Sequence, residues 1–147
     1  MTHPSKDDLD RFLLAQDPVF SQVVEELKAG DKQSHWMWFV FPQLRKLGRS
    51  GTAHYFGIED RDEARAYLDH PVLGPRLKEA FQLMLQHEEK SAEDILGPVD
   101  ALKLRSSATL FQIVAKDNSL FQQVLDRYYE GNPCPLTFES LQAPWLH

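Results

Sequence analysis

The sequence predicts an all-α protein, an irregular single-domain bundle of about six to eight helices. Apolar residues recur at helical spacing through most of the chain, whereas almost no segment alternates apolar and polar residues as a half-buried strand does. Helix-start and helix-stop signals follow one another at short intervals. Because no linker or repeat interrupts the chain, we expect one globular helical domain over residues 5–142, with frayed ends at 1–4 and 143–147.

Composition and charge exclude several classes of protein. The formal charge of −6 disfavours binding to the phosphate backbone of nucleic acids. The one cysteine, Cys134, excludes an internal disulfide framework, and the chain has no Walker loop, Rossmann glycine fingerprint or zinc-ligand pair. It also lacks a signal-like apolar run and any apolar segment of about 18 residues. We therefore expect a cytoplasmic protein with no metal or cofactor and with neither nucleic acid nor membrane as partner; the oligomeric state stays open.

The first helices are predicted from their start and stop signals. Residues 5–8, Ser-Lys-Asp-Asp, resemble a capping box and begin the first helix. Asp17 predicts a second start, with Pro18 at the first helical position. The apolar residues of 20–27 then follow an amphipathic spacing that ends before Gly30, where we expect a left-handed cap. Whether these are two helices or one kinked helix stays open.

The most apolar stretch of the chain is residues 36–41, Trp-Met-Trp-Phe-Val-Phe. Burial of each Phe or Trp contributes roughly 1.5–3 kcal/mol or more, so we expect this run inside the protein. Periodicity does not distinguish a buried strand from a buried helix in so short a run. Because the rest of the chain is helical in pattern, we expect a short helix that is capped by Ser34 and stopped near Phe41 by Pro42.

The middle of the chain combines a loop with two helices. Residues 49–57 contain two glycines among polar side chains and predict an ordered loop with at most one helical turn. Asp60 predicts the start of a helix that is broken at His70-Pro71. A longer helix with a 3.6-residue apolar stripe follows, from about Gly74 to Leu85.

The last third of the chain predicts four more helical segments, each with its own start signal. In order, these are a turn capped by Ser91 and ended by Gly97, a helix from Pro98 to about Val114, a helix that starts at Asp117–Ser119 and ends at Gly131, and a last turn from Thr137.

A polar line lies within the apolar stripe of the helix that Pro98 begins. At 100° per residue, Asp100, Lys103 and Ser107 fall within an arc of about 60°. Buried charges are unfavourable unless they are paired, and Asp100 and Lys103 have the spacing to pair with each other. The line is either a surface ion pair at the edge of the helix or part of a functional pocket.

Three polar sets embedded among aromatic residues motivate the pocket hypothesis. They are Lys32/Ser34/His35/Gln43, His70/Arg76 and Asp100/Lys103/Ser107. The cations of the three sets could hold an anion such as a phosphate, and aromatic rings could stack on a base. His35 and Asp100 are the candidate catalytic acid or base. The candidate ligand-binding residues are Lys32, Ser34, Trp36, Trp38, Gln43, Ser50, Tyr55, His70, Arg76, Lys103, Ser106 and Ser107.

The segment Gly30-x-Lys32-x-Ser34-His35-Trp36-Met37-Trp38-Phe39-x-Phe41-Pro42-Gln43-Leu44 resembles an uncharacterised bacterial domain family whose members are often mislabelled "calpastatin". The likeness covers about residues 8–142. Its other motifs are Leu47-Gly48-x-Ser50, Ala66-Tyr67-Leu68-x-His70-Pro71-x-Leu73-Gly74-x-Arg76-Leu77 and Asp100-x-x-Lys103-Leu104-x-Ser106-Ser107-x-Thr109-Leu110-Phe111.

The resemblance implies a compact, mainly helical domain and brings no established activity, substrate or cofactor. Ala108 departs from the family pattern, in which we expect methionine in many members. Calpastatin itself is a disordered inhibitor, whereas this composition is that of a globular protein. In size, helical character and polar-aromatic pocket the family is also loosely similar to NADAR-type ADP-ribosyl glycosidases, an analogy without aligned catalytic residues.

Two functions follow from these observations. The first is a small-molecule pocket for a nucleotide or an ADP-ribose-like anion, with a hydrolase or glycosidase activity as its catalytic form. The second is a non-enzymatic protein-interaction module in which the same residues form a purely structural polar-aromatic core. The sequence does not decide whether the protein is an enzyme.

Overall fold

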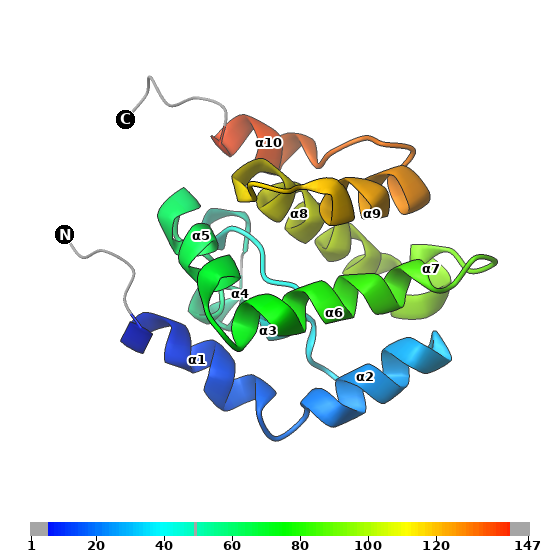
Figure 1. The fold of residues 1–147 in the computed structure, drawn as a ribbon, viewed down its shortest axis with the longest axis horizontal. Coiled ribbons are helices and arrows are strands. Elements are labelled where there is room, and N and C mark those ends of the chain that lie inside the picture. The colour runs from blue at the N-terminus through cyan, green and yellow to red at the C-terminus, as the bar shows by residue number, and fades with distance from the viewer. Residues whose placement is uncertain (1–5, 49, 142–147) are drawn as a thin grey trace.

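The computed structural model describes residues 6–48 and 50–141, which fold into α-helices joined by short loops (Figure 1). The predicted all-α class is confirmed, and the one strand-like pairing within these ranges is a single bridge between Leu44 and Ile58. The elements are α1 (Lys6–Gln16), α2 (Phe20–Ala29), α3 (Met37–Val40), the 3-10 turn η1 (Arg45–Leu47), α4 (Gly51–Tyr55), α5 (Arg61–Asp69), α6 (Leu73–Leu85), α7 (Ala92–Leu96), α8 (Pro98–Val114), α9 (Ser119–Tyr129) and α10 (Pro135–Leu141).

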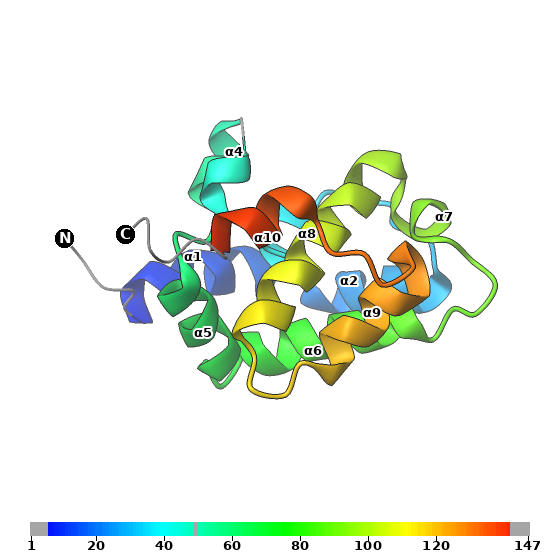
Figure 2. The ribbon, with the colours of Figure 1, turned by 90° about the horizontal axis from the view of Figure 1, so that it is seen from above.

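The helices are more numerous than the six to eight expected because several consist of one or two turns. The long helix α6 runs through the middle of the molecule, with α1 and α2 on one side and α8, α9 and α10 on the other (Figure 1). Both α2 and α9 contact α6. Viewed from above, α4 projects from one edge of the molecule (Figure 2).

The core is continuous and rich in aromatic rings. Six pairs of neighbouring rings, with centroids 4.8–6.2 Å apart, link the helices from the segment before α3 to α1. Tilted and edge-to-face pairs of this kind stabilise a fold beyond the area they bury. The chain of rings runs through Trp36, Phe41, Phe81, Phe121, Phe111, Tyr67 and Phe12.

Helix α8 is buried on nearly all sides in its second half, since α5, α7, α9 and α10 all pack against it. Several predicted boundaries around it are confirmed. Pro98 is its first residue and Val114 its last, and Ser91 forms a reciprocal capping box with Asp94 at the start of α7. Gly30 ends α2 with a φ of +70°, a left-handed conformation that glycine adopts without steric strain.

Two predicted caps are wrong, and in both cases a charged residue of another helix holds the side chain. Ser34 does not cap α3, whose N-cap is Trp36, because its hydroxyl donates to Glu26. Asp17 does not cap α2, whose N-cap is Val19, because its carboxylate pairs with Arg76.

At the other end of the chain, the last helix begins at Pro135 rather than Thr137, since proline is compatible with a first helical turn. The predictions for Ser5, for residues 1–4 and for residues 143–147 fall outside the described ranges.

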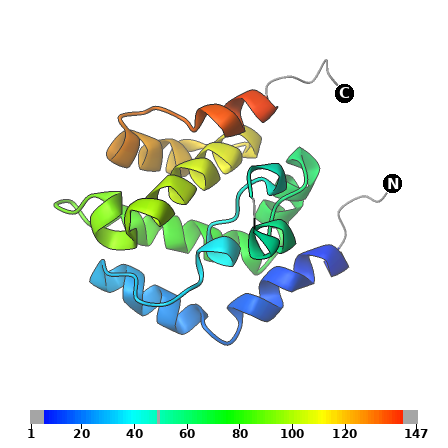
Figure 3. The same ribbon diagram turned by 180° about the vertical axis from the view of Figure 1, so that it is seen from behind.

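The segment between α2 and α3 lies between α2 and the beginning of α8 (Figure 3). It therefore brings Lys32 and Trp38 beside Asp100 and Lys103 of α8. Among the helices that the structure describes, none is long and apolar enough to cross a lipid bilayer.

Candidate functional site

Glu26 on α2 organises the segment that carries the first polar set. Its Oε1 accepts hydrogen bonds from the Gln33 and Ser34 backbone N–H groups, at 2.9 and 3.2 Å, and from Trp36 Nε1 at 2.8 Å. Its Oε2 accepts from Ser34 Oγ at 2.7 Å and from Gln22 Nε2 at 2.9 Å. One buried carboxylate thus holds the conformation of residues 33–36.

These hydrogen bonds also change the acidity of Glu26. Burial on its own would raise the pKa of this carboxyl group, since it disfavours the charged form. The hydrogen bonds from Gln33, Ser34 and Trp36 favour the charged form and outweigh burial, so the pKa falls from 4.5 to about 2. Glu26 is therefore ionised across the physiological range of pH.

Lys32 is fixed at the start of the same segment and reaches α8. Its backbone N–H donates to the carbonyl of Ile95 on α7 at 2.8 Å. Its Nζ lies 2.9 Å from Oδ2 of Asp100, and its ammonium group also lies 5.1 Å from the centre of the Trp36 ring. The first and third polar sets therefore meet.

Asp100 joins two lysines, and we call Lys32, Asp100 and Lys103 the Lys–Asp–Lys cluster. Oδ1 of Asp100 accepts from Lys103 Nζ at 3.2 Å, so each carboxylate oxygen faces one ammonium group. The three side chains are 9%, 17% and 19% exposed. Lys103 Nζ also lies 4.0 Å from the centre of the Trp38 ring, a favourable cation–π distance.

The cluster carries one positive charge in excess. Its two ammonium groups face one carboxylate, and in the part of the chain that the structure describes no second carboxylate pairs with either lysine. The aromatic rings stabilise the cations but do not neutralise them. The protein as a whole has a net charge of −6, but the potential at this cluster is locally positive. A local positive potential attracts anions.

Ser107 lies one helical turn beyond Lys103 on α8. Its side chain is fully buried, and its Oγ has no hydrogen-bond partner within the described residues. Its neighbour Ser106 is different, because its Oγ lies 2.8 Å from the Thr137 hydroxyl and ties α8 to α10. The Ser106 hydroxyl therefore has a partner within the fold.

The second polar set, His70 and Arg76, makes its contacts elsewhere. Nδ1 of His70 accepts from the N–H groups of Val72 and Leu73, at 3.1 and 3.2 Å, and so caps the start of α6. Arg76 lies 2.9 Å from Asp17 and donates to the Gln16 amide oxygen at 3.3 Å. The structure therefore does not bring this set to the Lys–Asp–Lys cluster by any contact of the described residues.

Of the two tryptophans proposed for stacking, Trp36 is buried and Trp38 is half-buried. His35 is exposed in the segment that Glu26 holds. Gln43 is half-buried, and its backbone carbonyl accepts from the N–H of Ile58 at 2.9 Å.

The two remaining candidates belong to α4. Ser50 is its N-cap and accepts from Ala53 N–H at 3.0 Å. Tyr55 is 57% exposed and packs edge-on against Phe56. Neither residue contacts the Lys–Asp–Lys cluster.

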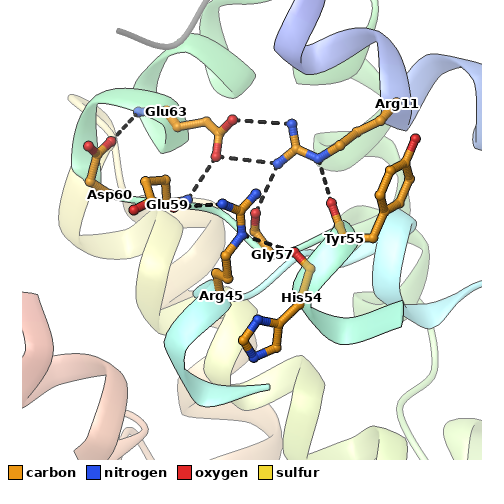
Figure 4. Close-up of polar contacts among 8 residues, drawn as sticks. All are labelled: Arg11, Arg45, His54, Tyr55, Gly57, Glu59, Asp60 and Glu63. Carbon is orange, nitrogen blue, oxygen red and sulfur yellow. Dashed lines mark hydrogen bonds and ion pairs between the residues drawn. The ribbon is translucent and has the colours of Figure 1, made fainter. Parts of the chain in front are cut away.

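A polar network that the sequence did not reveal joins α1 to α5. Figure 4 shows Arg11 pointing toward Glu63 and toward the carbonyl groups of Tyr55 and Gly57. The Nη1 of Arg11 lies 3.3 Å from Glu63 Oε2, and both side chains are largely buried. Glu63 also accepts from the Glu59 N–H at 2.7 Å. These contacts are typical of a structural clamp that fixes the α4–α5 loop.

Among the surface cavities lined by described residues, three have no residue of the Lys–Asp–Lys cluster in their lining. One of about 510 Å³ is floored by Leu44 and Leu141 and rimmed by charged side chains of residues 59–65. The other two are lined by residues of α6 and α9 and by residues 86–90. Across residues 6–48 and 50–141, no three His, Cys, Asp or Glu side chains are grouped so as to hold a metal ion.

Comparisons with known proteins assign a family without an activity. The family profile described as "Protein of unknown function (DUF1810)" matches residues 6–141. The fold is similar to the crystal structure of the conserved hypothetical protein Rv1873 from Mycobacterium tuberculosis, with a TM-score of 0.90 and 51% sequence identity. The match covers 91% of this chain and 96% of that one. No curated protein matches the chain.

Proposed function

The chain belongs to the DUF1810 family of proteins of unknown function, and we propose that its Lys–Asp–Lys cluster binds a small, phosphate-bearing anion. The observation that carries the proposal is the meeting of two largely buried lysines on one carboxylate, beside the half-buried ring of Trp38. A single lysine would suffice for a structural ion pair with Asp100. The second leaves an uncompensated charge.

That excess charge favours a ligand because an unneutralised ammonium group is unfavourable away from water. A bound anion supplies the missing negative charge and accepts hydrogen bonds from the N–H groups of the two lysines. Each ammonium group has three donors, and lysine is a common partner of phosphate groups in proteins.

The surroundings favour a nucleotide-like molecule over a free ion or a polymer. Trp38 is half-buried, and because the Lys103 ammonium lies over one face of its ring, a base would stack on the opposite face. The net charge of −6 repels a long polyanion but leaves room for a compact one at a local positive site. An ADP-ribose-like molecule combines a diphosphate with a base and fits both properties.

A hydrolase or glycosidase acting on such a ligand would need a general acid or base near the anion. His35 is exposed in the ordered segment that begins at Lys32, and Asp100 lies within the cluster itself. Incubation of the protein with ADP-ribose or a nucleoside phosphate, followed by chromatography, would show products only if the site is catalytic.

The second candidate function is a protein-interaction module, and a specific feature favours it. Val99 and Leu102, at the start of α8, are 66% and 67% exposed. In that function the Lys–Asp–Lys cluster is only a structural tie between the α2–α3 segment and α8. Mutation of either lysine would then lower stability without affecting any small ligand.

The test is a titration of pyrophosphate, AMP and ADP-ribose, followed by calorimetry and by thermal unfolding. A ligand at 100 times its Kd adds about 2.7 kcal/mol to the free energy of unfolding. For a chain of this size the Tm then rises by roughly 5 °C or more. We expect such a shift in the wild type, and a Kd at least about tenfold weaker in Lys32→Ala and in Lys103→Ala.

Lys116→Ala is the matched control, since this exposed lysine lies in the loop between α8 and α9. It should bind as the wild type does. The proposal fails if no phosphate compound binds, or if all three alanine variants bind equally well.

A further inference from the structure

The carboxylate of Asp100 occupies the position between the two ammonium groups that an anion would take. We propose that Asp100 is the specificity-determining residue of this site: its carboxylate stands in for the ligand in the free protein and is displaced by a phosphate or diphosphate group. The inference rests on the proposed function and adds to it a mode of binding and a class of ligand.

The contacts of Asp100 have the geometry of a bound anion. Its two oxygens each face a different lysine, at 2.9 Å from Lys32 and 3.2 Å from Lys103. Two oxygens of a phosphate group can make the same pair of contacts. A ligand that reached both lysines while Asp100 stayed in place would add its charge beside the carboxylate, which is unfavourable.

Asp100 makes fewer polar contacts than Glu26, the buried carboxylate of the region. Glu26 accepts hydrogen bonds from five donors, four of which come from the segment that it organises. Within the described residues, the carboxylate of Asp100 has polar contacts only with the two lysines. When Asp100 leaves, the only groups that lose a partner are the ammonium groups that the ligand then takes up.

The position of Asp100 in the fold keeps the free-energy cost of moving its carboxylate small. It lies in the first turn of α8, where the helix dipole favours a negative charge in more than one side-chain orientation. Its side chain is 17% exposed and borders Val99, which is 66% exposed, so solvent lies close by. Rotation about its side-chain bonds moves the carboxylate toward water without a change in the backbone.

The Asp100 carboxylate competes with any free anion for the two lysines, and this competition determines which class of ligand binds. Asp100 is tethered beside the lysines and so competes at a high effective concentration. A free monocarboxylate offers the same group without the tether and does not displace it. A phosphate dianion or a diphosphate has a greater charge, and it gains more from two ammonium groups than the aspartate does. The wild-type site therefore selects phosphate compounds over carboxylates.

The experiment compares the wild type with Asp100→Asn, which keeps the shape of the side chain but removes its charge. Binding of pyrophosphate and of acetate is measured by calorimetry in a chloride buffer of low ionic strength. We expect Asp100→Asn to bind pyrophosphate at least tenfold more tightly than the wild type, about 1.4 kcal/mol. We also expect it to bind acetate, which the wild type does not.

A second readout is thermal unfolding. Asp100→Asn leaves two largely buried lysines without a counter-charge, so its Tm without anions should be lower than that of the wild type. Pyrophosphate should raise the Tm of Asp100→Asn toward that of the wild type, because it replaces the missing carboxylate.

An NMR measurement on the wild type tests the displacement even if the variant does not fold. Displacement by pyrophosphate changes the environment of the Asp100 carboxyl group and should therefore shift its carbon-13 resonance.

The outcomes separate this inference from the proposed function. If pyrophosphate binds the wild type and the lysine variants weaken it, but Asp100→Asn binds no more tightly, the anion site stands and the displacement of Asp100 is refuted. An Asp100 resonance that does not respond to bound pyrophosphate refutes it as well. If neither the wild type nor Asp100→Asn binds pyrophosphate, both proposals fail.

Discussion

Glu26 gives the sharpest stability prediction, because its folded-state pKa and its partners are both defined. In the folded protein its pKa is about 2, compared with 4.5 for an unperturbed glutamate. As the pH falls, the unfolded chain therefore takes up a proton before the folded protein does. The resulting stabilisation is complete above about pH 4.5 and is lost as the pH falls toward 2, and it amounts to about 3 kcal/mol.

The perturbation is Glu26→Gln, which keeps the size of the side chain and removes its charge. The amide can accept some of the hydrogen bonds, but its NH₂ group faces donors from Ser34 and Gln22. At pH 7 we expect the free energy of unfolding to fall by about 3 kcal/mol. At pH 3 the advantage of the wild type should shrink by about 2 kcal/mol, since the unfolded wild type is by then largely protonated.

Urea denaturation of both proteins from pH 3 to pH 7 measures this difference. Taking the difference removes the contributions of the other carboxyl groups, which both proteins share. Glu25→Gln is the matched control, because Glu25 is the exposed neighbour of Glu26 on α2. Its effect should stay within about 0.5 kcal/mol at every pH. A Glu26→Gln effect that does not change with pH would refute the assignment of Glu26 as the charged organiser of residues 33–36.

The remaining predictions concern stability and are each read by urea or thermal denaturation. Arg11→Met breaks the buried pair with Glu63 and should cost about 3–5 kcal/mol; a loss below about 1 kcal/mol would mean that the clamp is unimportant. Gly74→Ala places a Cβ against the Leu68 carbonyl and should cost about 1–3 kcal/mol. Gly51→Ala, whose Cβ meets open space in α4, should stabilise by about 0.4–1 kcal/mol, and equal effects at the two glycines would contradict this packing. Ser107→Ala removes a buried hydroxyl without a partner and should leave stability unchanged or raise it by up to about 1 kcal/mol; a clear loss would reveal a partner for Ser107.

The features that follow from local sequence were predictable. The all-α class, the proline at the start of α8 and the glycine at the end of α2 depend on backbone preferences of nearby residues. The contact between Asp100 and Lys103 likewise follows from their spacing on one helix.

The contacts between distant segments were not predictable. Nothing in the sequence distinguishes Glu26 among 22 acidic residues, because its role arises only when the segment after α2 folds back on it. The same fold-back onto α2 draws Ser34 away from its expected cap. The contact between Lys32 and Asp100 also depends on the fold. The backbone N–H of Lys32 donates to Ile95 on α7, and this hydrogen bond holds Lys32 beside α8.

His70 illustrates a different limit. Its grouping with Arg76, as a polar set among aromatic residues, suggested a ligand-binding residue. In the structure its ring accepts two backbone N–H groups at the start of α6, a role that sequence rules expect from Ser, Thr, Asp or Asn.

The most direct test of the central proposal observes the two lysines themselves. Nitrogen-15 spectra of the lysine ammonium groups, recorded during a titration with pyrophosphate, report on each Nζ separately. We expect the signals of Lys32 and Lys103 to move together and to saturate, while that of the exposed Lys116 stays in place. If every lysine signal moves equally, or if Lys32 and Lys103 do not respond at saturating pyrophosphate, the Lys–Asp–Lys cluster is not an anion site.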